Sequence, residues 1–326
     1  MDVGRRRAGT APRERIVNDA IEVAASILRA ACGERVLARF PLAPLTSFRV
    51  GGPAALYLEP ERDEDLAVAG EAVAASGIPV VVVGKGSNLL VSDRGFPGLV
   101  LRLGHGYRWA ARDGARLTAG GAMPLPALSG IALQHGLSGL EFGVAIPATV
   151  GGAVRMNAGA HEGAMSDVVE QVDVFVLSEG RGTSILGKDA GFGYRRSMLP
   201  EDGVVTGITA HLTPGLPEQI RERMESARAW RRATQPLAEP NCGSVFKNPP
   251  GDHAARLIEA AGAKGMRVGG ASISTKHANF IVAGPDSTAA DILALIRQVE
   301  EIVRETSGVD LEPEVYLVGE FDHAAG

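Results

Sequence analysis

Consecutive valines at positions 80 to 83 run directly into the loop Gly84-Lys85-Gly86-Ser87-Asn88. A β-branched run predicts a buried strand, and the two glycines let the following backbone take positive φ and expose its N–H groups. N–H groups exposed in this way bind anions, and Lys85 adds a positive charge. The junction therefore predicts a strand that ends in a phosphate-binding loop, with a plain strand-to-loop turn as the alternative.

Two common nucleotide-binding motifs do not fit this loop. The Walker A motif requires its lysine to be followed by Ser or Thr, whereas Lys85 is followed by Gly86. The dinucleotide fingerprint requires a third glycine at the place that Leu89 occupies. Any phosphate binding by this loop must therefore follow another pattern.

The length and charge of the chain limit its class. At 326 residues it is long enough for two domains with cores of their own. Its net charge of -5 argues against a nucleic-acid partner held by bulk charge. The two cysteines, Cys32 and Cys242, are too few for a disulfide framework or a zinc site and fit a reducing cytoplasm. The small number of cysteines also leads us to expect no metal. No segment approaches the ~20 apolar residues of a membrane span, so we expect no membrane partner.

Hydrophobic spacing sets the expected secondary structure. A helical period predicts helices over residues 16–33, 61–76, 124–135, 217–233, 253–261 and 289–306. Apolar or alternating runs predict strands over residues 55–58, 80–83, 99–103, 172–176, 203–213, 279–283 and 314–318. Thr288 with Asp291 predicts a capping box at the start of the last helix, and Gly308 predicts its end.

A linker divides the chain. Residues 234–240, Thr-Gln-Pro-Leu-Ala-Glu-Pro, predict a domain boundary between Leu216 and Pro240, and the helix over 217–233 could belong to either side. We expect an N-terminal extension over residues 1–33, formed by a tail and a helix, a first domain over 34–215 and a smaller α+β domain over 216–326.

A second glycine-rich region, residues 139–160, is long, apolar and almost uncharged. Surface loops are rarely so apolar. The region therefore predicts a segment that wraps a large, partly apolar ligand through its backbone amides. A buried helix-and-turn pair is the alternative.

Polar residues that could carry chemistry occur at three places. Ser244 follows Gly243 on an open turn, and a hydroxyl can donate a proton there with help from a cation such as Lys247; an exposed serine in a strand-entry turn is the alternative. A carboxylate could be bound by Arg195 or Arg196, which otherwise form a solvated basic turn. The position of Glu314 in an apolar strand is unusual, because carboxylates are seldom buried without a partner, although an edge strand could expose it to water.

Taken in order, these segments resemble the family of UDP-N-acetylenolpyruvoylglucosamine reductases, flavoenzymes of bacterial peptidoglycan synthesis. The similarity extends from about Ala43 to Glu320 and looks like the shorter, type II branch of the family. It rests on Thr46-Ser47-Phe48-Arg49-Val50-Gly51-Gly52, Gly84-Lys85-Gly86-Ser87-Asn88, the segment from Ile146-Pro147 to Asn157-Ala158-Gly159-Ala160, Tyr194-Arg195-Arg196-Ser197, Gly243-Ser244-Val245-Phe246-Lys247-Asn248-Pro249, Lys276-His277-Ala278-Asn279-Phe280 and Glu312-Pro313-Glu314-Val315.

The resemblance implies an α+β fold with a two-lobed FAD-binding domain of the vanillyl-alcohol-oxidase (PCMH) type over residues 34–215, followed by a substrate-binding domain. It implies non-covalent FAD, NADPH as the reductant, a UDP-sugar substrate and a cytoplasmic enzyme, which we expect to be a monomer. The expected reaction reduces the enolpyruvyl group of UDP-N-acetylglucosamine enolpyruvate to give UDP-N-acetylmuramate.

Residue by residue, the resemblance also assigns roles. Ser244 is expected to donate the proton, and Arg195 with Glu314 to polarise the enolpyruvyl carboxylate and stabilise the intermediate. The substrate is expected to contact Tyr194, Lys247 and Asn248. The FAD contacts are expected at Arg49, Gly51, Gly52, Gly84, Lys85, Gly86, Ser87, Asn88, Leu89, Pro147, Gly151, Gly152, Asn157 and Gly159.

The chain departs from the family pattern at Ala145 and Ala148, where glycine is expected, so two methyl groups stand near the expected cofactor loop. The alternatives are another FAD-linked oxidoreductase of the same fold and a nucleotide-binding module without activity. The first would not need Ser244, Arg195 and Glu314 together, and the second would bind FAD or a UDP-sugar without oxidising NADPH.

Overall fold

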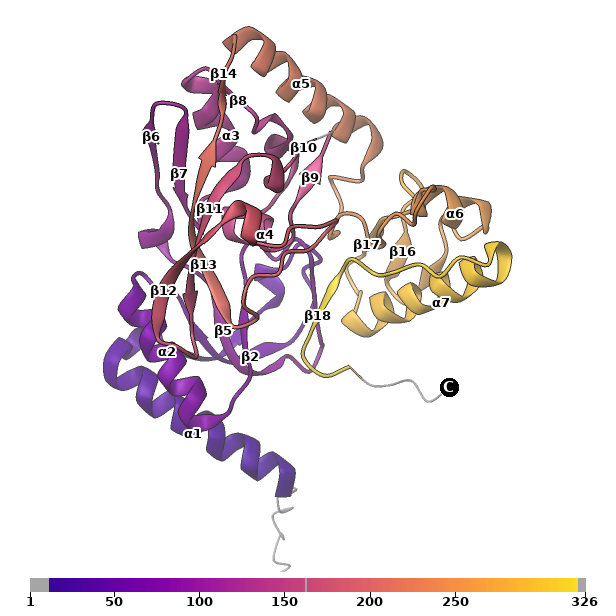
Figure 1. Cartoon of the computed structure of the whole chain (residues 1–326). Coiled ribbons are helices and arrows are strands. Elements are labelled where there is room, and N and C mark those ends of the chain that lie inside the picture. The colour runs from indigo at the N-terminus through magenta and orange to yellow at the C-terminus, as the bar shows by residue number, and fades with distance from the viewer. Residues whose placement is uncertain (1–11, 162, 322–326) are drawn as a thin grey trace, which may run out of the picture.

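The computed structural model describes residues 12–161 and 163–321, and Figure 1 shows them as an α+β chain with two large sheets and a smaller C-terminal unit. The first sheet has the order β1-β2-β5-β3, with β1 antiparallel and the others parallel. Its strands are β1 (Leu37–Pro41), β2 (Pro53–Leu58), β5 (Phe96–Leu101) and β3 (Val80–Val82). The valine run therefore forms a strand within the residues predicted for it, but the prediction of a buried strand is wrong, because β3 lies at the edge of this sheet and its residues are half-buried or exposed.

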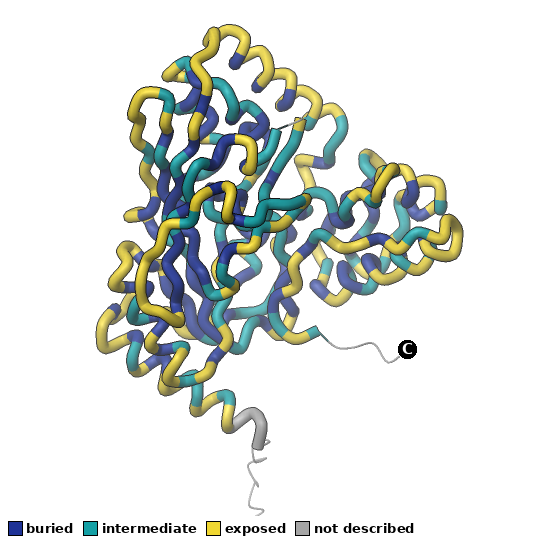
Figure 2. The backbone as a smooth tube through the Cα atoms, in the orientation of Figure 1, coloured by how far each residue is buried: buried dark blue, intermediate teal, exposed yellow. Residues whose placement is uncertain are grey.

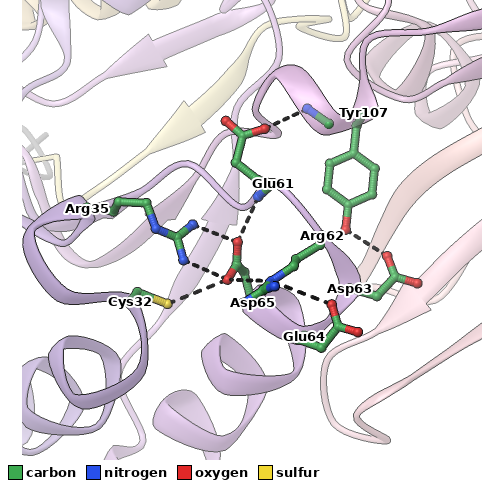
Figure 3. A network of polar contacts seen from close by, with 9 residues as sticks. Cys32, Arg35, Glu61, Arg62, Asp63, Glu64, Asp65 and Tyr107 are labelled. Carbon is green, nitrogen blue, oxygen red and sulfur yellow. Dashed lines mark hydrogen bonds and ion pairs between the residues drawn. The ribbon is translucent and has the colours of Figure 1, made fainter.

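Two helices cover the first sheet. Helix α1 (Pro12–Cys32) packs against α2 (Asp63–Ser76), and the apolar side chains of both helices share a core with β2 and β5. An ion pair also joins the short turn after α1 (Gly33–Arg35) to α2, because the Arg35 guanidinium meets both oxygens of Asp65 at 2.7 and 2.8 Å (Figure 3). The N-terminal helix is thus packed on the main body, while residues 1–11 of the expected tail lie outside the described residues.

The second sheet is antiparallel, with the order β12-β11-β13-β7-β6. Its strands are β12 (Arg181–Leu186), β11 (Val169–Val176), β13 (Gly203–His211), β7 (Arg116–Gly120) and β6 (Ala110–Asp113). Helices α3 (Leu125–Gln134) and α4 (Val150–Arg155) bury their apolar faces against it. Two short antiparallel pairs complete this part, β8 (Leu137–Ser138) with β14 (Thr213–Pro214) and β9 (Gly159–Ala160) with β10 (Gly163–Ala164).

The C-terminal unit is a small sheet packed against two helices. Its elements are α6 (Ala254–Ala260), β15 (Arg267–Val268), β16 (Ala271–Ile273), β17 (Ile281–Ala283) and α7 (Ala289–Ser307). The start of α7 has the predicted capping box of Thr288 and Asp291, and Gly308 ends the helix in the left-handed conformation. Phe48 and Leu90 come from the part of the chain that forms the first sheet, which we call the first lobe, and both enter the core of this unit. The first lobe and the C-terminal unit therefore share one hydrophobic cluster.

Helix α5 (Pro217–Thr234) packs on the FAD-binding side of the expected boundary. Its buried residues Ile220, Met224 and Ala227 form a cluster with Val144 and Ala145. The expected C-terminal domain begins at residue 216, but the sequence also allows this helix to belong to either side of the boundary, and its packing favours the first domain. The cluster also explains Ala145, because its methyl group contributes to the contact with α5.

The last strand is shorter than predicted and belongs to another part of the chain. Strand β18 (Tyr316–Val318) pairs in parallel with β4 (Leu89–Val91), directly after the 84–88 loop. Figure 1 shows this yellow segment returning from the C-terminal unit to the first lobe. Glu314 lies before the strand, so the alternation of side chains along a strand does not determine which way the Glu314 side chain points. Figure 2 shows that the buried segments follow the two large sheets and continue into the small unit.

Candidate active site

The 84–88 loop presents several free main-chain donors. Within the described part of the chain, none of its five N–H groups donates a hydrogen bond to another residue. Gly86 is buried with φ of 60°, and Lys85 is exposed. A Cβ atom at Gly86 would lie 2.0 Å from the carbonyl oxygen of Leu45, so only glycine fits. The loop can therefore offer its N–H groups to an anionic group, as predicted.

The turn before β2 covers this loop. The Ser47 N–H donates to the Gly86 carbonyl at 3.0 Å, and the Ser47 hydroxyl oxygen is buried without a hydrogen-bond partner in the described residues. Arg49 is exposed with φ of 61°. Gly51 packs closely on the last residue of β4, and Gly52 packs closely on the residues that follow this strand. A buried polar atom left unpaired costs free energy, so the Ser47 hydroxyl fits a polar ligand at this place.

The second glycine-rich region reaches the same loop through α4. A Cβ atom at Gly84 would lie 2.5 Å from the Thr149 hydroxyl oxygen, which accepts a hydrogen bond from Gly152 N–H at 3.3 Å. The Gly151 N–H donates to the Gly121 carbonyl at 2.9 Å, and Pro147 is exposed beside the start of the helix. The structure thus brings these predicted cofactor residues beside the 84–88 loop, although the N–H groups of Gly151 and Gly152 are already used within the protein.

Asn157 and Gly159 support the turn that carries Arg195. The Asn157 amide donates to the Gly193 carbonyl at 3.0 Å, and its side-chain oxygen accepts from the Ser166 N–H at 2.9 Å. The Gly159 carbonyl accepts from Arg195 Nη1 at 3.0 Å. Both residues therefore hold the arginine in place, in addition to the cofactor role that we predict for them.

Arg195 and Glu314 form a partly buried ion pair. Arg195 Nε lies 2.9 Å from Glu314 Oε1, and the two side chains are 23% and 14% exposed. Nε is buried and has no well-aligned hydrogen bond to any residue that the structure describes, so its contact with Glu314 is electrostatic. Arg195 also has φ of 57°, a conformation that costs a non-glycine residue free energy. The surrounding contacts hold the guanidinium in one orientation despite this strain.

The surroundings of Glu314 connect the ion pair to both predicted loops. Its N–H donates to the Val245 carbonyl at 2.7 Å, next to Ser244, and its own carbonyl accepts from Asn88 Nδ2 at 2.9 Å. Burial raises the pKa of the Glu314 carboxyl, and the charges of Arg195 and Lys247 oppose this increase. Ser244 itself is partly exposed, so its hydroxyl is accessible beside this pair of loops.

The predicted substrate residues lie along the same face. The Asn248 N–H donates to the Tyr194 hydroxyl oxygen at 3.3 Å, and the Arg195 guanidinium lies 5.4 Å from the centre of the Tyr194 ring. Lys247 Nζ forms an ion pair with Glu312 Oε1. The Asn248 side-chain oxygen accepts from Ala254 N–H at 3.1 Å, at the start of α6. Tyr194 remains 56% exposed, so its ring is available to a ligand.

Two polar residues near the site, the partly buried Arg155 and the buried Asn279, were not predicted to act there. Arg155 donates to the carbonyls of Leu199, Pro200 and Gly203, which follow the Arg195 turn. Asn279, only 4% exposed, bonds to the main chain of Phe246. The sequence motif around Asn279 is specific, but a residue whose partners are main-chain atoms leaves no side-chain pattern that would reveal its role.

Two cavities lie away from these residues. One, of about 530 Å³, is bounded by α5 and the β9–β10 pair and contains the Glu141–Arg223 ion pair. The other, of about 490 Å³, lies beside the start of α2 and is lined by Glu61, Asp63 and Trp109. Neither cavity is lined by a predicted catalytic residue, so cavity size alone does not locate the candidate site.

Comparisons with known proteins agree with this arrangement. Residues 54–185 match the family model of an FAD binding domain, and residues 235–318 match that of the UDP-N-acetylenolpyruvoylglucosamine reductase C-terminal domain. The second match begins directly after α5, in agreement with the packing of that helix. The predicted two-part fold class is thereby confirmed.

Curated relatives extend over most of the chain. The UDP-N-acetylenolpyruvoylglucosamine reductase of Heliobacterium modesticaldum is 46% identical over 282 residues, which cover 86% of this chain and 90% of the relative. That of Anaeromyxobacter sp. strain Fw109-5 is also 46% identical, over 297 residues and 92% of its length. The crystal structure of the enzyme from Thermus caldophilus superposes with a TM-score of 0.76 at 40% identity, covering 87% of this chain and 99% of that chain.

Proposed function

The chain belongs to the UDP-N-acetylenolpyruvoylglucosamine reductase family, and from this premise we propose that it reduces UDP-N-acetylglucosamine enolpyruvate to UDP-N-acetylmuramate at the expense of NADPH. The observation that carries the proposal is the Arg195–Glu314 ion pair at 2.9 Å, whose carboxylate residue is hydrogen bonded through its main chain to both Asn88 and Val245. These contacts support an anion-binding role for Arg195, because its partner Glu314 is held by both the predicted cofactor loop and the residue after the predicted proton donor.

The residues present fit FAD. The free N–H groups of the 84–88 loop and the unpaired Ser47 hydroxyl suit its pyrophosphate, and the apolar 139–160 segment suits its larger rings. The chemistry that bound FAD supplies is the relay of a hydride from NADPH to the methylene carbon of the enolpyruvyl group. Every other role in the proposal belongs to side chains and main-chain groups of this chain.

Arg195 is proposed to bind the enolpyruvyl carboxylate. Adding a hydride to the double bond moves negative charge toward that carboxylate, and a fixed cation nearby stabilises the transition state. Glu314 and the Gly159 carbonyl hold the guanidinium in one orientation before substrate arrives. Because the arginine is already fixed, little reorganisation free energy is needed during the reaction.

Ser244 is proposed to complete the reaction by donating a proton to the carbon next to the carboxylate. The two electrons arrive with the hydride, the proton comes from the hydroxyl and is replaced from solvent, and NADP⁺ leaves. Ser244 can act in this way because it is partly exposed and the segment that follows it is bonded to Glu314. The contribution of a positioned acid is typically a factor of about 10² to 10⁴ in rate.

The sequence contains no second nucleotide-binding fingerprint, which supports NADPH and the UDP-sugar taking turns in one cleft. Tyr194, Lys247 and Asn248 line one face near Arg195 and are proposed to contact the substrate. Cytoplasmic location, a monomeric state and the absence of a nucleic-acid partner remain predictions. Among the described residues, no helix is both long and apolar enough to cross a membrane.

One anaerobic experiment tests the proposal. The visible spectrum of the FAD-loaded protein is recorded, NADPH is added, and enolpyruvyl-UDP-N-acetylglucosamine follows once the flavin is bleached. We expect the substrate to restore the oxidised spectrum with formation of UDP-N-acetylmuramate. A bleached flavin that only oxygen restores would indicate another FAD-linked oxidoreductase of this fold, and a protein that takes up FAD but ignores NADPH would indicate a binding module.

A further inference from the structure

The segment that carries Ser244 is held by one buried amide side chain. Asn279 lies between β16 and β17 and is 4% exposed. Its side-chain oxygen accepts from the Phe246 N–H at 2.9 Å, and its amide nitrogen donates to the Phe246 carbonyl at 2.8 Å. The side chain thus pairs with both main-chain groups of one residue, as a neighbouring β-strand would.

The main chain of Asn279 adds a third contact. Its carbonyl accepts from the Val245 N–H at 2.9 Å, so one residue satisfies three of the four main-chain polar groups of Val245 and Phe246. On the other side, the Val245 carbonyl accepts from the Glu314 N–H at 2.7 Å, and the Lys247 N–H donates to the Glu312 carbonyl at 2.9 Å. The segment 245–247 is therefore held between Asn279 and the residues around Glu314.

The chain before Ser244 is held by the buried Cys242 and by a hydrogen bond of 3.0 Å from the Gly243 N–H to the Asn241 side-chain oxygen. Between these contacts and Ser244 stands Gly243, with φ of 83° and no atom within 4 Å of the place where a Cβ would lie. Glycine has more accessible backbone conformations than any other residue, so Ser244 can still turn about this point. The position of the hydroxyl therefore depends also on the residues that follow it, which are the ones that Asn279 holds.

We propose that Asn279 is a positioning residue that keeps the Ser244 hydroxyl in register with Glu314 and Arg195 for proton transfer; this inference rests on the proposed function. Asn279 does not contact substrate, because its side chain is buried and both of its polar atoms are used. It acts through Ser244 alone. Loss of the amide leaves the Phe246 N–H and carbonyl without partners, so the segment shifts to recover them.

The test separates the two half-reactions in stopped-flow experiments on the FAD-loaded protein. Asn279→Leu removes both side-chain hydrogen bonds at similar volume, and Asn279→Asp keeps the shape but removes the donor to Phe246. We expect reoxidation of the reduced flavin by enolpyruvyl-UDP-N-acetylglucosamine to slow by roughly 10- to 100-fold, the usual effect of misplacing a catalytic group. Flavin reduction by NADPH should remain within about twofold, since it needs no proton from Ser244.

Ser274→Ala is the matched control, because Ser274 is equally buried in the same hairpin and its hydroxyl bonds, among the described residues, only to the Lys276 N–H. It should leave both half-reactions unchanged.

A double variant gives the sharper result. In a Ser244→Ala background, Asn279→Leu should slow reoxidation by no more than about twofold, since the rate effects of residues that act through one group are not additive.

The outcomes are distinguishable. If the wild-type flavin is not reoxidised by the substrate, the proposed function fails. If the wild type turns over and both Asn279 variants reoxidise at its rate, the positioning role is overturned while the function stands. Equal slowing of both half-reactions, or a full additional loss in the Ser244→Ala background, would show a general structural effect and would also overturn the role.

Discussion

The side-chain amide of Asn88 donates a hydrogen bond of 2.9 Å to the main-chain carbonyl of Glu314, 226 residues further along the chain. The carbonyl of Asn88 in turn accepts from the Tyr316 N–H at 2.9 Å. One residue of the predicted cofactor loop thereby holds the main chain at Glu314 and two residues after it. FAD binding and the position of Glu314 should therefore depend on each other.

Asn88→Leu should weaken both properties together. The substitution leaves the Glu314 carbonyl without its donor, which costs about 1 kcal/mol of stability when the group is partly buried. We expect faster FAD dissociation and slower reoxidation by the enolpyruvyl substrate in the same variant. Measured FAD affinity and single-turnover rates check this. Loss of FAD affinity with normal turnover of the loaded enzyme would separate the two functions and contradict the coupling.

Ser244→Ala should retain FAD and still be reduced by NADPH. Without the proposed acid, reduction of the enolpyruvyl group should fall by roughly two to four orders of magnitude. Rapid-mixing measurements of each half-reaction give the result directly. Ser307→Ala, at the end of α7, is the control, because its hydroxyl bonds to the Val303 carbonyl within the helix and to the Val309 N–H, away from the proposed site residues. Normal turnover by Ser244→Ala would remove this residue from its role.

Glu314 should make stability depend on pH. Burial raises the pKa of its carboxyl in the folded protein above the ordinary value of 4.5, despite the charge of Arg195. The folded state then binds the proton more tightly than the unfolded state, so the free energy of unfolding falls as pH rises from 4.5 through the folded pKa.

The measurement is urea unfolding of the wild type and of Glu314→Gln over this pH range. The variant cannot ionise at this position, so the decrease specific to Glu314 should be absent from its pH profile. Identical pH profiles for the two proteins would show that the carboxyl has the same pKa folded and unfolded. Glu314→Gln should also slow reoxidation, because Arg195 loses the charge that orients it.

Asp65 should stabilise the attachment of the N-terminal helix. Its side chain is 4% exposed and receives both nitrogens of Arg35, and this pairing lowers the pKa of the Asp65 carboxyl (Figure 3). Asp65→Ala should cost about 1 kcal/mol by removing the carboxylate that Arg35 and the Glu61 N–H donate to, since the Arg35 side chain is 41% exposed and water can replace part of the lost contact. The stabilisation by Asp65 is fully present above the pKa of its carboxyl in the unfolded chain, near 3.8. It is lost as pH falls through the lower pKa of the same carboxyl in the folded protein.

Glu64→Ala is the matched control on the same turn of α2. Its side chain is 77% exposed, so its removal should change the free energy of unfolding by less than about 0.5 kcal/mol. Urea unfolding at neutral pH compares the two variants. Equal effects of Asp65→Ala and Glu64→Ala would mean that the Arg35–Asp65 pair does not stabilise the fold.

Local sequence determined those parts of the protein whose physical causes are local. The valine run became β3, the glycine loop after it exposes its N–H groups, and α7 begins and ends at the residues that its capping pattern predicts. A cap, a turn or a hydrophobic period involves only neighbours in the chain. Specific motifs in a fixed order also sufficed to predict the family and the FAD-binding fold.

Only the tertiary structure decided the features that depend on distant partners. Helix α5 has one apolar stripe that could pack on either side, and the cluster with Val144 and Ala145 settles which. Arg195 and Arg196 are chemically equivalent in sequence, but Arg195 alone meets Glu314, while Arg196 bonds through its main chain to Gly193. The contacts of Asn88 and Asn279 are with main-chain carbonyls and N–H groups, which every residue carries. Such partners leave no mark in the sequence, and only folding brings them within hydrogen-bond distance.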